Sequence, residues 1–535
     1  MKKLITPEKP FVKSEKGLYQ LKTRSAYSGK VKIYGILMLL SCIVFFVSCE
    51  KELISSNAEQ EEITASKPDL IFYGLTNSGQ VQKYNAMDPA TPISSAALTG
   101  LQSREKILAI DFRPATGQLY GLGSSSRIYV INYETGAARA IGTGSFTPAL
   151  EGEIAGFDFN PTVDRIRIVT SKGQSLRLNP ETGMGAIIDG AINGVPDAMV
   201  SAVAYSGNKA GSAATTLYDI DVKTQKLYRQ DPPNAGTLVE IGSLQQNITG
   251  EGGFDISPDG IALATLWCKS KSTLFQIDLE TGKASKLGDH KDNILIGLAI
   301  PTEPVAYAVC NTNDLFIFNP MNPEPVTKPI TGLQPNEKIV GLDMRPANGQ
   351  LYALGNTCRL YTINASNGAA TMVGTMPLSP SLSGKDFGFD FNPVVDRIRV
   401  VSNTGQNLRL HPETGVVAAT DGNLNPGTPV VTAAAYSNNF AGTTATTLYD
   451  IDTSSDKLFK QMPPNDGTLV EVGALGVDAE ASNGFDIGGT SGKAYAILTV
   501  AGSNKIYEIS LGTGAATALS GFPKTVRGMT LGVGF

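Results

Sequence analysis

The sequence predicts an all-β protein built from tandem β-propellers whose blades are four-stranded antiparallel sheets. The first observation is a long repeat, because FGFDFNPVVDRIRVV at 387–401 nearly matches AGFDFNPTVDRIRIV at 155–169. The second is a finer repeat of about 40–45 residues, which is the length of a propeller blade. The third is a set of short runs rich in Val, Ile, Tyr and Thr that are separated by glycine-ending turns. We expect two five-bladed rings, and one ten-bladed ring is the alternative.

The second blade shows how each unit is built. AIDFRP (109–114) and QLYGLG (118–123) are two short alternating runs, and RIYVINYETG (127–136) is a third run that ends in a turn. AARAIGT (137–143) supplies the fourth strand. The turn recurs as LNPETG, IDLETG, INASNG and LHPETG, and its final glycine suits a tight hairpin with positive φ. Five such units fit in each half of the chain.

The ends of the repeat bear on how the blades close. The first blade starts at DLIFYGLT (69–76) without a preceding GFDF-like strand, and VRGMTLGVGF (526–535) at the C-terminus resembles one. We therefore expect the last strand to complete a ring begun at the N-terminus, which removes exposed strand edges. ILIGLAI (294–300) offers the first half a closing strand of its own. The residue spacing across the junction of the halves favours one continuous ring, whereas the usual range of about 4–8 blades favours two.

The N-terminal part predicts export and a lipid anchor. Residues 1–48 have the pattern of a signal sequence, in which the apolar run IYGILMLLSCIVFFVS (33–48) ends in a lipobox-like FVSC. Cys49 is the expected lipidation site, and residues 49–68 form an acidic, flexible tether. An uncleaved anchor helix is the alternative, although the run is short for about 30 Å of hydrocarbon. The body is then expected at the outer membrane or cell surface of a bacterium.

The two halves, 69–300 and 301–535, share a specific string of motifs. The first half carries LYGLG, GFDFNPTVDRIRIV, GQSLRLNPETG, ATTLYDID and PPNAGTLVEIG, and the second half carries a copy of each. The string resembles an uncharacterised bacterial family, domain of unknown function 4394, and the resemblance covers nearly all of 69–535 in two copies. Family members with a single copy imply that one half can fold alone. The resemblance implies no activity and no catalytic residues.

Acidic residues recur at one position in the first strand of several blades. Each is flanked by apolar residues, so its side chain faces the opposite side of the strand. They are Asp111, Asp158, Asp255, Asp343, Asp390 and Asp486. If this face lines a central channel, three carboxylates per ring could bind Ca²⁺, with Asp158 and Asp390 as the candidate metal ligands. The favoured alternative is structural: the carboxylates accept hydrogen bonds from backbone between blades or pair with arginines, and no cofactor is bound.

Two further sets of polar residues are candidates for binding. The DRIR segments at 164–167 and 396–399 could hold a carboxylate or phosphate, but Asp–Arg pairs that clamp adjacent blades are the favoured interpretation. Long, varied loops such as GSFTPALEGE and PLSPSLSGKD share one face of the ring, where binding is typical. The candidate ligand contacts near that face are Gln174, Arg177, Gln406 and Arg409, and ordinary exposed polar residues are the alternative.

Composition narrows the function further. A net charge of −5 with scattered basic residues argues against a nucleic-acid partner. The chain has two histidines and no GxSxG, HExxH or Walker motif, so no catalytic residue is predicted. The sequence favours a lipid-anchored, non-catalytic binding or scaffolding module for a glycan, peptide or protein partner, and it indicates no oligomeric state. The alternative is an extracytoplasmic hydrolase or lyase that uses the channel carboxylates, with or without a divalent metal.

Overall fold

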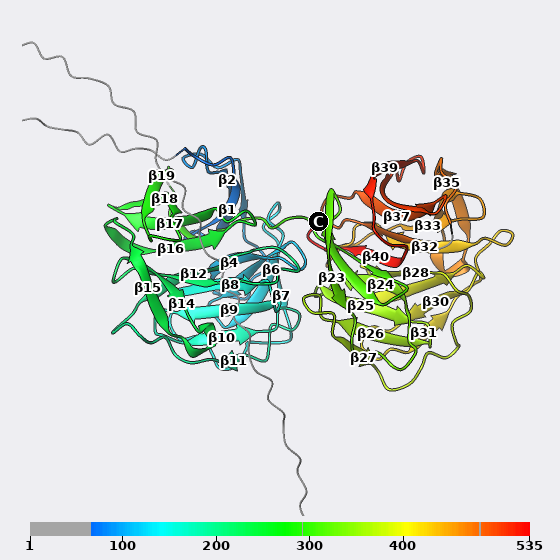
Figure 1. Ribbon diagram of the computed structural model, residues 1–535, viewed down its shortest axis with the longest axis horizontal. Coiled ribbons are helices and arrows are strands. Elements are labelled where there is room, and N and C mark those ends of the chain that lie inside the picture. The colour runs from blue at the N-terminus through cyan, green and yellow to red at the C-terminus, as the bar shows by residue number, and fades with distance from the viewer. Residues whose placement is uncertain (1–65, 292, 481–482) are drawn as a thin grey trace, which may run out of the picture. The chain divides into compact units, whose positions relative to one another are not determined.

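The computed structural model describes residues 66–291, 293–480 and 483–535 (Figure 1). The predicted signal sequence and Cys49 lie outside these residues. Within them, the strands form ten four-stranded antiparallel sheets, five in each half. The all-β class and the four-stranded repeat unit are therefore confirmed. No helix in the described part of the chain is long and apolar enough to cross a membrane.

The first half holds five sheets, and in all of them except the first the strands pair in chain order. The first sheet contains β20 (Leu295–Ala299), β1 (Ile71–Thr76), β2 (Gln80–Asn85) and β3 (Ser94–Ala97). The second contains β4 (Ile107–Arg113), β5 (Gln118–Gly123), β6 (Arg127–Ile131) and β7 (Ala138–Ile141). The third contains β8 (Ala155–Asn160), β9 (Arg165–Thr170), β10 (Ser175–Leu178) and β11 (Ile187–Ile188). The fourth contains β12 (Val200–Tyr205), β13 (Leu217–Asp221), β14 (Lys226–Gln230) and β15 (Leu238–Ser243), with the 3₁₀ turn η1 (Pro233–Ala235) between the last two. The fifth contains β16 (Ile248–Ile256), β17 (Ala262–Cys268), β18 (Lys271–Ile277) and β19 (Ala284–Asp289).

The second half repeats this arrangement. Its first sheet contains β40 (Val526–Leu531), β21 (Ala306–Cys310), β22 (Asp314–Asn319) and β23 (Asn322–Pro329). The second contains β24 (Ile339–Arg345), β25 (Gln350–Gly355), β26 (Arg359–Ile363) and β27 (Ala370–Val373). The third contains β28 (Phe387–Asn392), β29 (Arg397–Ser402), β30 (Asn407–Leu410) and β31 (Val417–Thr420). The fourth contains β32 (Val431–Tyr436), β33 (Leu448–Asp452), β34 (Lys457–Gln461) and β35 (Leu469–Ala474), with η2 (Pro464–Asp466). The fifth contains β36 (Gly484–Ile487), β37 (Ala494–Val500), β38 (Ser503–Ile509) and β39 (Ala516–Gly521).

The last strand of each half pairs with the first strand of the same half. In the first half β20 pairs with β1, and Ala299 lies opposite Tyr73. In the second half β40 pairs with β21, and Thr530 lies opposite Tyr307. The expectation that the last strand of the chain joins the first is therefore wrong, because β20 already occupies the edge of β1 that β40 would need.

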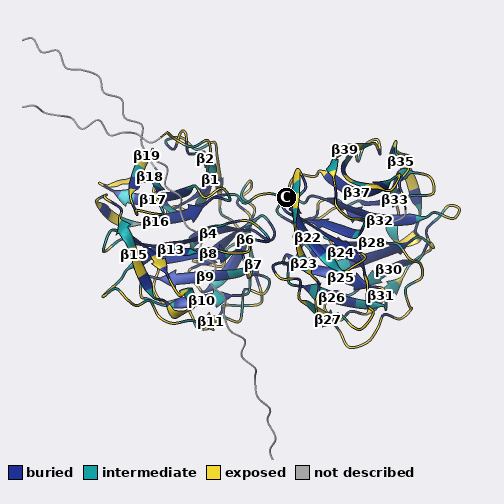
Figure 2. Ribbon diagram, viewed as in Figure 1, coloured by how far each residue is buried: buried dark blue, intermediate teal, exposed yellow. Residues whose placement is uncertain are grey.

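Five strands in each half contact one another in succession, and we name them the central strands. In the first half they are β4, β8, β12, β16 and β20, and β20 contacts β4 again. In the second half they are β24, β28, β32, β36 and β40, and β40 contacts β24 again. Figure 2 shows these strands as the most deeply buried parts of each half. The core of each half thus lies between sheets that are joined along their central strands.

Glycines on the central strands allow a very close approach between neighbouring sheets. A Cβ atom on Gly253 would lie 1.9 Å from the backbone N of Leu298, and one on Gly484 would lie 2.8 Å from that of Met529. Real Cβ atoms essentially never come that close to backbone, so a side chain at either position would push the strands apart. The GFDI motif therefore places its glycine where two central strands nearly touch.

The Asn-Pro turn that follows GFDF is closed by its own side chains. Asn160 accepts a hydrogen bond from the backbone N–H of Thr162, and Asp164 adopts a left-handed φ of 50°. The second copy repeats both features, with Asn392 at the start and Asp396 at φ 51°. Asn and Asp tolerate these conformations better than other residues with a Cβ atom. The turn fixes the register between β8 and β9. The register in turn determines toward which face of the sheet each side chain of these strands points, in both copies of the motif.

Candidate functional site

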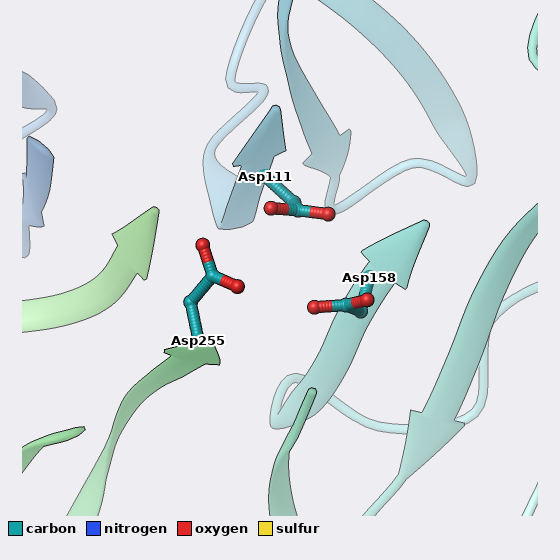
Figure 3. A group of neighbouring side chains, drawn as sticks. All are labelled: Asp111, Asp158 and Asp255. Atoms are coloured by element: carbon teal, nitrogen blue, oxygen red, sulfur yellow. The ribbon is translucent and has the colours of Figure 1, made fainter. Parts of the chain in front are cut away.

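Three carboxylates meet in the middle of the first half. They belong to Asp111 on β4, Asp158 on β8 and Asp255 on β16, and we name them the first centre. One oxygen from each lies within 4.8 Å of the others, and each residue is only 1% exposed. Figure 3 shows the side chains pointing from three separate strands toward a common space. The expectation that these aspartates converge is confirmed.

Each aspartate of the first centre accepts a hydrogen bond from the next central strand. Asp111 accepts from the N–H of Phe159 at 2.9 Å, and Asp158 Oδ1 accepts from the N–H of Tyr205 at 3.1 Å. Asp255 Oδ2 accepts in the same way from Ile300, which follows β20, at 2.6 Å. These bonds link adjacent sheets, as the structural interpretation of the sequence predicts, and they leave metal binding untested.

The loop between β12 and β13 closes one side of the first centre. Asn208 in this loop is 0% exposed, and its Nδ2 donates to Asp255 Oδ1 at 3.3 Å. The N–H of Ile256 donates to the same oxygen at 2.6 Å. Asp255 is therefore the most heavily bonded member of the centre, whereas the buried Asp158 Oδ2 has no hydrogen-bond partner among the described residues. The carbonyl oxygen of Asn208 also lacks a partner in this part of the chain.

Burial makes all three carboxylates of the first centre hard to ionise. Burial, and then the charge of Asp255, raise the pKa of Asp111 well above its usual range. The pKa of Asp158 is raised well above its usual range by burial and by the charges of Asp111 and Asp255. Burial raises the pKa of Asp255 to about 7, against the effect of its backbone hydrogen bonds. Near neutral pH the centre therefore holds protons unless a cation takes their place.

The second half contains a corresponding second centre, made of Asp343, Asp390 and Asp486. Their carboxylates also lie within 4.8 Å of one another and are buried. Their hydrogen bonds to the next central strand repeat those of the first centre: Asp343 accepts from Phe391, Asp390 from Tyr436, and Asp486 from Leu531. The pKa of Asp343 and of Asp390 is raised well above the usual range, first by burial and then by neighbouring carboxylates. Burial raises the pKa of Asp486 to about 7.

The second centre has one extra polar group. The hydroxyl of Thr530 on β40 lies 2.8 Å from Asp343 Oδ1 and 3.0 Å from Asp486 Oδ2. It also accepts a hydrogen bond from the N–H of Met344 at 3.1 Å. The corresponding residue of the first half is Ala299, because each lies opposite the tyrosine at the same place in the closing pair of strands. Sequence reasoning missed both Thr530 and Asn208, although the two closing strands GLAI and GMTL differ visibly at this position.

A small hollow lies next to each centre. Its lining residues precede the aspartates along the central strands, and in the first half they include Ala109, Gly156, Phe157, Gly253 and Gly297. The hollow of the second half is lined by the corresponding residues. Glycines and alanines of the central strands thus line the two hollows, and none of the six aspartates is among the lining residues.

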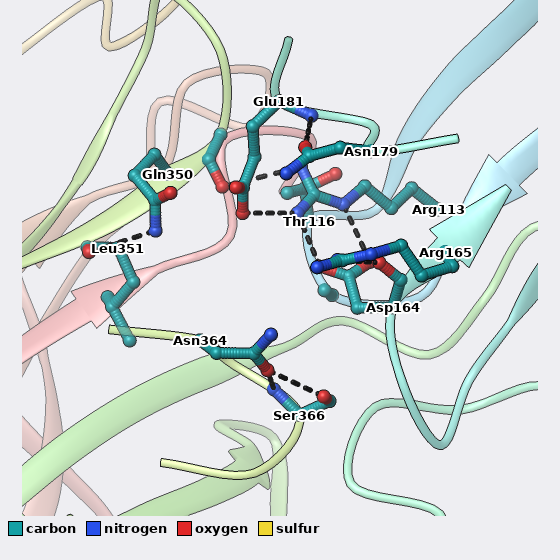
Figure 4. Close-up of polar contacts among 12 residues, drawn as sticks. Arg113, Thr116, Asp164, Arg165, Asn179, Glu181, Gln350, Leu351, Asn364 and Ser366 are labelled. Atoms are coloured by element: carbon teal, nitrogen blue, oxygen red, sulfur yellow. Dashed lines mark hydrogen bonds and ion pairs between the residues drawn. The ribbon is translucent and has the colours of Figure 1, made fainter. Parts of the chain in front are cut away.

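The aspartate of each DRIR segment clamps two sheets together. Arg113 on β4 donates to both oxygens of Asp164, at 2.9 and 2.5 Å, and also reaches Glu181 at 3.1 Å (Figure 4). Arg345 repeats the paired contact with Asp396 in the second half, at 2.9 and 2.5 Å. The favoured structural interpretation of these aspartates is confirmed, because the planar guanidinium matches a carboxylate of the chain itself.

The candidate ligand contacts Arg177 and Arg409 take part in a second, similar network. Arg177 donates to both oxygens of Asp189, at 2.7 and 2.8 Å, and the buried Arg167 reaches the same carboxylate at 2.5 Å. In the second half Arg409 holds Asp421 at 2.8 Å with both nitrogens, and Arg399 donates to Asp421 as well. The two arginines are partly exposed. Their proposed contact with a ligand remains a prediction.

The other two candidates, Gln174 and Gln406, hold a neighbouring loop. Gln174 donates to the carbonyl of Ala149 at 2.9 Å and accepts from the N–H of Glu151 at 3.0 Å. Gln406 makes the same pair of bonds, to Ser381 at 2.9 Å and from Ser383 at 2.8 Å. Each glutamine thus fixes the long loop that precedes the third sheet of its half. Whether these residues also contact a ligand stays a prediction.

Two other buried aspartates were not predicted from the sequence. Asp219 on β13 and Asp450 on β33 are 0% exposed, and within the described ranges neither oxygen of either residue has a hydrogen-bond partner. Burial raises the pKa of each to about 8, although the charges of Arg167 and Arg399 oppose the change. The LYDID motif gives no sign of this, because an aspartate in an alternating strand is expected to face solvent.

The histidines and cysteines offer little additional chemistry. His290, which the sequence places in a polar segment, is 5% exposed, and its Nδ1 lies 2.8 Å from the carbonyl oxygen of Pro89. Burial lowers its pKa to about 4. Among the described residues Cys268, Cys310 and Cys358 are free thiols.

Comparison with solved structures finds distant partial matches. The extracellular domain of BT4673 from B. thetaiotaomicron is 10% identical, with a TM-score of 0.26 over 85% of this chain and 65% of that chain. PorZ, a surface component of the type IX secretion system of Porphyromonas gingivalis, is 13% identical, with a TM-score of 0.26 over 85% of this chain and 59% of that chain. The chain therefore spans less than two thirds of the length of either protein.

Comparison of the sequence with known families gives a direct assignment. No curated protein matches the chain. A family model matches it twice, over residues 80–299 and 314–530, which fall in the two halves predicted from the internal repeat. These ranges contain the aspartates of both centres, the arginine clamps and Thr530. The chain therefore belongs to the family described as domain of unknown function (DUF4394), of which it carries two tandem copies.

Proposed function

We propose that the protein is a lipid-anchored module of the bacterial cell envelope in which two five-bladed β-propellers bind a glycan, peptide or protein partner without catalysis. The pairing of β20 with β1, and of β40 with β21, supports closure of each half by itself. The apolar run before Cys49 supports export and lipidation at that residue. The outer membrane, facing the outside of the cell, is the proposed location.

The observation that carries the binding role is a shared frame that holds two different loops. Residues 142–154 and 374–386 precede β8 and β28, and each is fixed by the same pair of glutamine hydrogen bonds. Each loop also inserts one apolar anchor into the core, Phe146 in the first and Leu378 in the second. Most of the remaining loop residues are exposed. Loops that are held in place while their exposed residues differ are typical of binding surfaces on a rigid scaffold.

The two loops also differ in charge. The first exposes Glu151 and Glu153, whereas the second carries Lys385 next to the partly buried Asp386. Two copies of one frame can therefore present different surfaces to one partner or to two. The carboxylates of both centres are buried and accept hydrogen bonds from backbone, which favours a structural role over hydrolysis.

Binding of the full chain to a glycan array and to a panel of purified envelope proteins tests this proposal. For each ligand found, Glu151→Lys with Glu153→Lys is expected to change affinity at least tenfold, since charge at an interface governs recognition. The matched control is Glu134→Lys with Glu280→Lys, which alters exposed residues in hairpin turns of the opposite edge. Equal effects of the two double variants would contradict a role for the loops.

The anchor is tested separately by metabolic labelling with palmitate. The full chain is expected to incorporate the label in a bacterium that processes lipoproteins, and Cys49→Ala should abolish incorporation. Cys42→Ala, in the apolar run, serves as the control and should leave labelling unchanged. Labelling that persists in Cys49→Ala would show that the lipobox is not used.

A further inference from the structure

We propose that the first centre binds one divalent cation of the calcium class, and that the hydroxyl of Thr530 takes the place of that cation in the second centre. This inference is independent of the proposed partner binding. It rests on four observations: the spacing of the carboxylates, the source of their hydrogen bonds, two unpartnered oxygens, and the difference between the centres.

The spacing suits a cation that is bound by oxygen atoms. Calcium lies about 2.3–2.6 Å from its oxygen ligands, so two ligands of one ion are at most about 5 Å apart. The three carboxylates of the first centre each offer an oxygen within 4.8 Å of the other two. A single ion placed between Asp111, Asp158 and Asp255 can therefore contact all three, and Figure 3 shows them facing a common space.

The charge of the first centre is not matched by a basic side chain of the described residues. The hydrogen bonds that these carboxylates accept come from backbone N–H groups and from the amide of Asn208. Such donors reduce the cost of burying carboxylates but do not cancel their charge. Three mutually close carboxylates in a buried site therefore require either protons or a bound cation.

Two buried oxygens at this site have no partner among the described residues. Asp158 Oδ2 is one of them, and its carboxylate points toward Asp111 and Asp255 (Figure 3). The other is Oδ1 of Asn208, whose Nδ2 is held against Asp255. The corresponding Asn439 of the second half also has a buried Oδ1 without a partner among the described residues, so this oxygen does not by itself distinguish the two centres. If the amide turns by 180° about its last bond, Oδ1 takes the place of Nδ2 and faces the carboxylates. A carbonyl oxygen there is unfavourable next to carboxylates alone and favourable next to a hard cation.

The second centre shows what replaces the cation. Thr530 Oγ1 lies between Asp343 and Asp486, at 2.8 and 3.0 Å, and can donate its proton to one carboxyl oxygen and accept from the other if that carboxyl is protonated. Of the six aspartates in the two centres, Asp158 alone has a fully buried oxygen without a partner in the part of the chain that the structure describes, although Thr530 itself contacts Asp343 and Asp486 rather than Asp390. The methyl group of Ala299 cannot make these bonds, which leaves the first centre the one suited to an ion.

The test is the calcium content of the folded full chain. The protein is treated with a chelator, dialysed and titrated with CaCl₂, and bound metal is measured by mass spectrometry and calorimetry, with MgCl₂ as the comparison. We expect one Ca²⁺ per chain. Asp158→Asn should remove it, while Asn keeps an oxygen that accepts from Tyr205, so the link to β12 is retained. The matched control Asp390→Asn in the second centre should leave one Ca²⁺ per chain.

Exchanging the one residue that differs sharpens the test. Ala299→Thr is expected to abolish calcium binding, and Thr530→Ala to create a second site. Circular dichroism and thermal unfolding check that each variant is folded. If an exchange variant does not fold, the comparison of Asp158→Asn with the wild type still tests the proposal.

The proposal is overturned if the wild type binds no divalent ion at millimolar concentration, which means that protons alone neutralise the centre. Binding that survives Asp158→Asn, or two ions in the wild type, also overturns it.

Discussion

The first and second centres occupy corresponding places in the two halves and differ in how their carboxylates are satisfied. Both place three aspartates on three central strands, and both use them to accept N–H groups from the next strand. The second centre adds the hydroxyl of Thr530, whereas the first has the methyl group of Ala299 and the amide of Asn208. The bonds between strands are thus common to both centres, which differ in the polar groups that contact their remaining carboxylate oxygens.

This difference separates two roles of a buried carboxylate. One role is to satisfy backbone groups where neighbouring sheets meet, and it is set by the strand geometry that the repeat duplicates. The other is to form a charged centre, and a single residue on the closing strand is enough to change it. Substitutions of single residues can separate the two roles, and the largest effect is expected at Asp255.

Removing Asp255 should destabilise the fold more than removing Asp158. Asp255 accepts hydrogen bonds from Ile256, Ile300 and Asn208, whereas Asp158 accepts only one, from Tyr205. Each buried donor left without a partner costs about 1–3 kcal/mol, so the loss of three acceptors in Asp255→Ala should lower the free energy of unfolding by about 3–9 kcal/mol. Asp158→Ala should cost about 1–3 kcal/mol. Urea unfolding in the presence of a chelator measures both, and equal losses would show that the hydrogen bonds do not set the cost.

The stability of both halves should fall as the pH rises from about 4 to 8. Burial raises the pKa of Asp219 and Asp450 from 3.8 to about 8, against the nearby Arg167 and Arg399. Below pH 4 the carboxyl is neutral in the folded and unfolded states alike. Between these values the unfolded chain releases the proton while the folded chain keeps it, so the free energy of unfolding decreases with pH and levels off above about 8.

Replacing both residues by asparagine tests this pH dependence. Asp219→Asn and Asp450→Asn each keep a neutral side chain, so each variant should gain stability over the wild type as the pH rises. The gain should reach a few kcal/mol at pH 8 compared with pH 4, since one pKa unit corresponds to about 1.4 kcal/mol. Thermal unfolding across this pH range measures it. Because both sites have the same surroundings, the two variants should behave alike, and a gain at low pH only would contradict the assignment.

Replacing the Thr530 hydroxyl by a methyl group should have a smaller effect. Thr530→Val keeps the shape of the side chain but removes a hydrogen bond to Asp343 or Asp486, and it leaves the N–H of Met344 without its acceptor. The expected loss is about 1–3 kcal/mol in chelator. In the first centre, Ala299→Thr should be more stable than Ala299→Val by a similar amount under the same conditions. If the threonine and valine variants unfold with the same free energy at both positions, the hydroxyl does not stabilise the carboxyl groups of the second centre.

The sequence patterns predicted the repeated four-stranded units well, because each motif determines the conformation of only a few neighbouring residues. The glycine-ending hairpin turns, the four short strands of each unit and the Asp–Arg pairs of the DRIR segments were expected, and the structure has them. The convergence of Asp111, Asp158 and Asp255 was also predictable, since the same position recurs on successive central strands. The clamp between Arg113 and Asp164 follows the same logic, although its arginine partner was not named.

The parts that could not be predicted depend on residues far apart in the chain. Asn208 lies 47 residues from Asp255, in a loop (SGNKAGS) that the second half repeats as SNNFAGT, but neither copy indicates a contact with a distant aspartate. The closing role of β20 depends on which of two similar strands pairs with β1, and the residue spacing across the junction of the halves did not indicate it. Burial of Asp219 depends on the sheets packed on either side of β13. Each of these features is set by packing between sheets, which strand periodicity does not describe.

The smallest expected effect concerns the loops rather than the centres, and there the two halves should agree. Gln174 holds Ala149 and Glu151, and Gln406 holds Ser381 and Ser383 through the same pair of bonds. Gln174→Ala and Gln406→Ala should each lower the free energy of unfolding by less than about 2 kcal/mol, because the bonds lie near the surface. Hydrogen exchange at the amides of Glu151 and Ser383 should quicken about tenfold in the matching variant, as local opening becomes easier. Faster amide exchange in only one of the two variants would show that the two loops are held by different contacts. The structural correspondence between the halves would then be limited to the central strands.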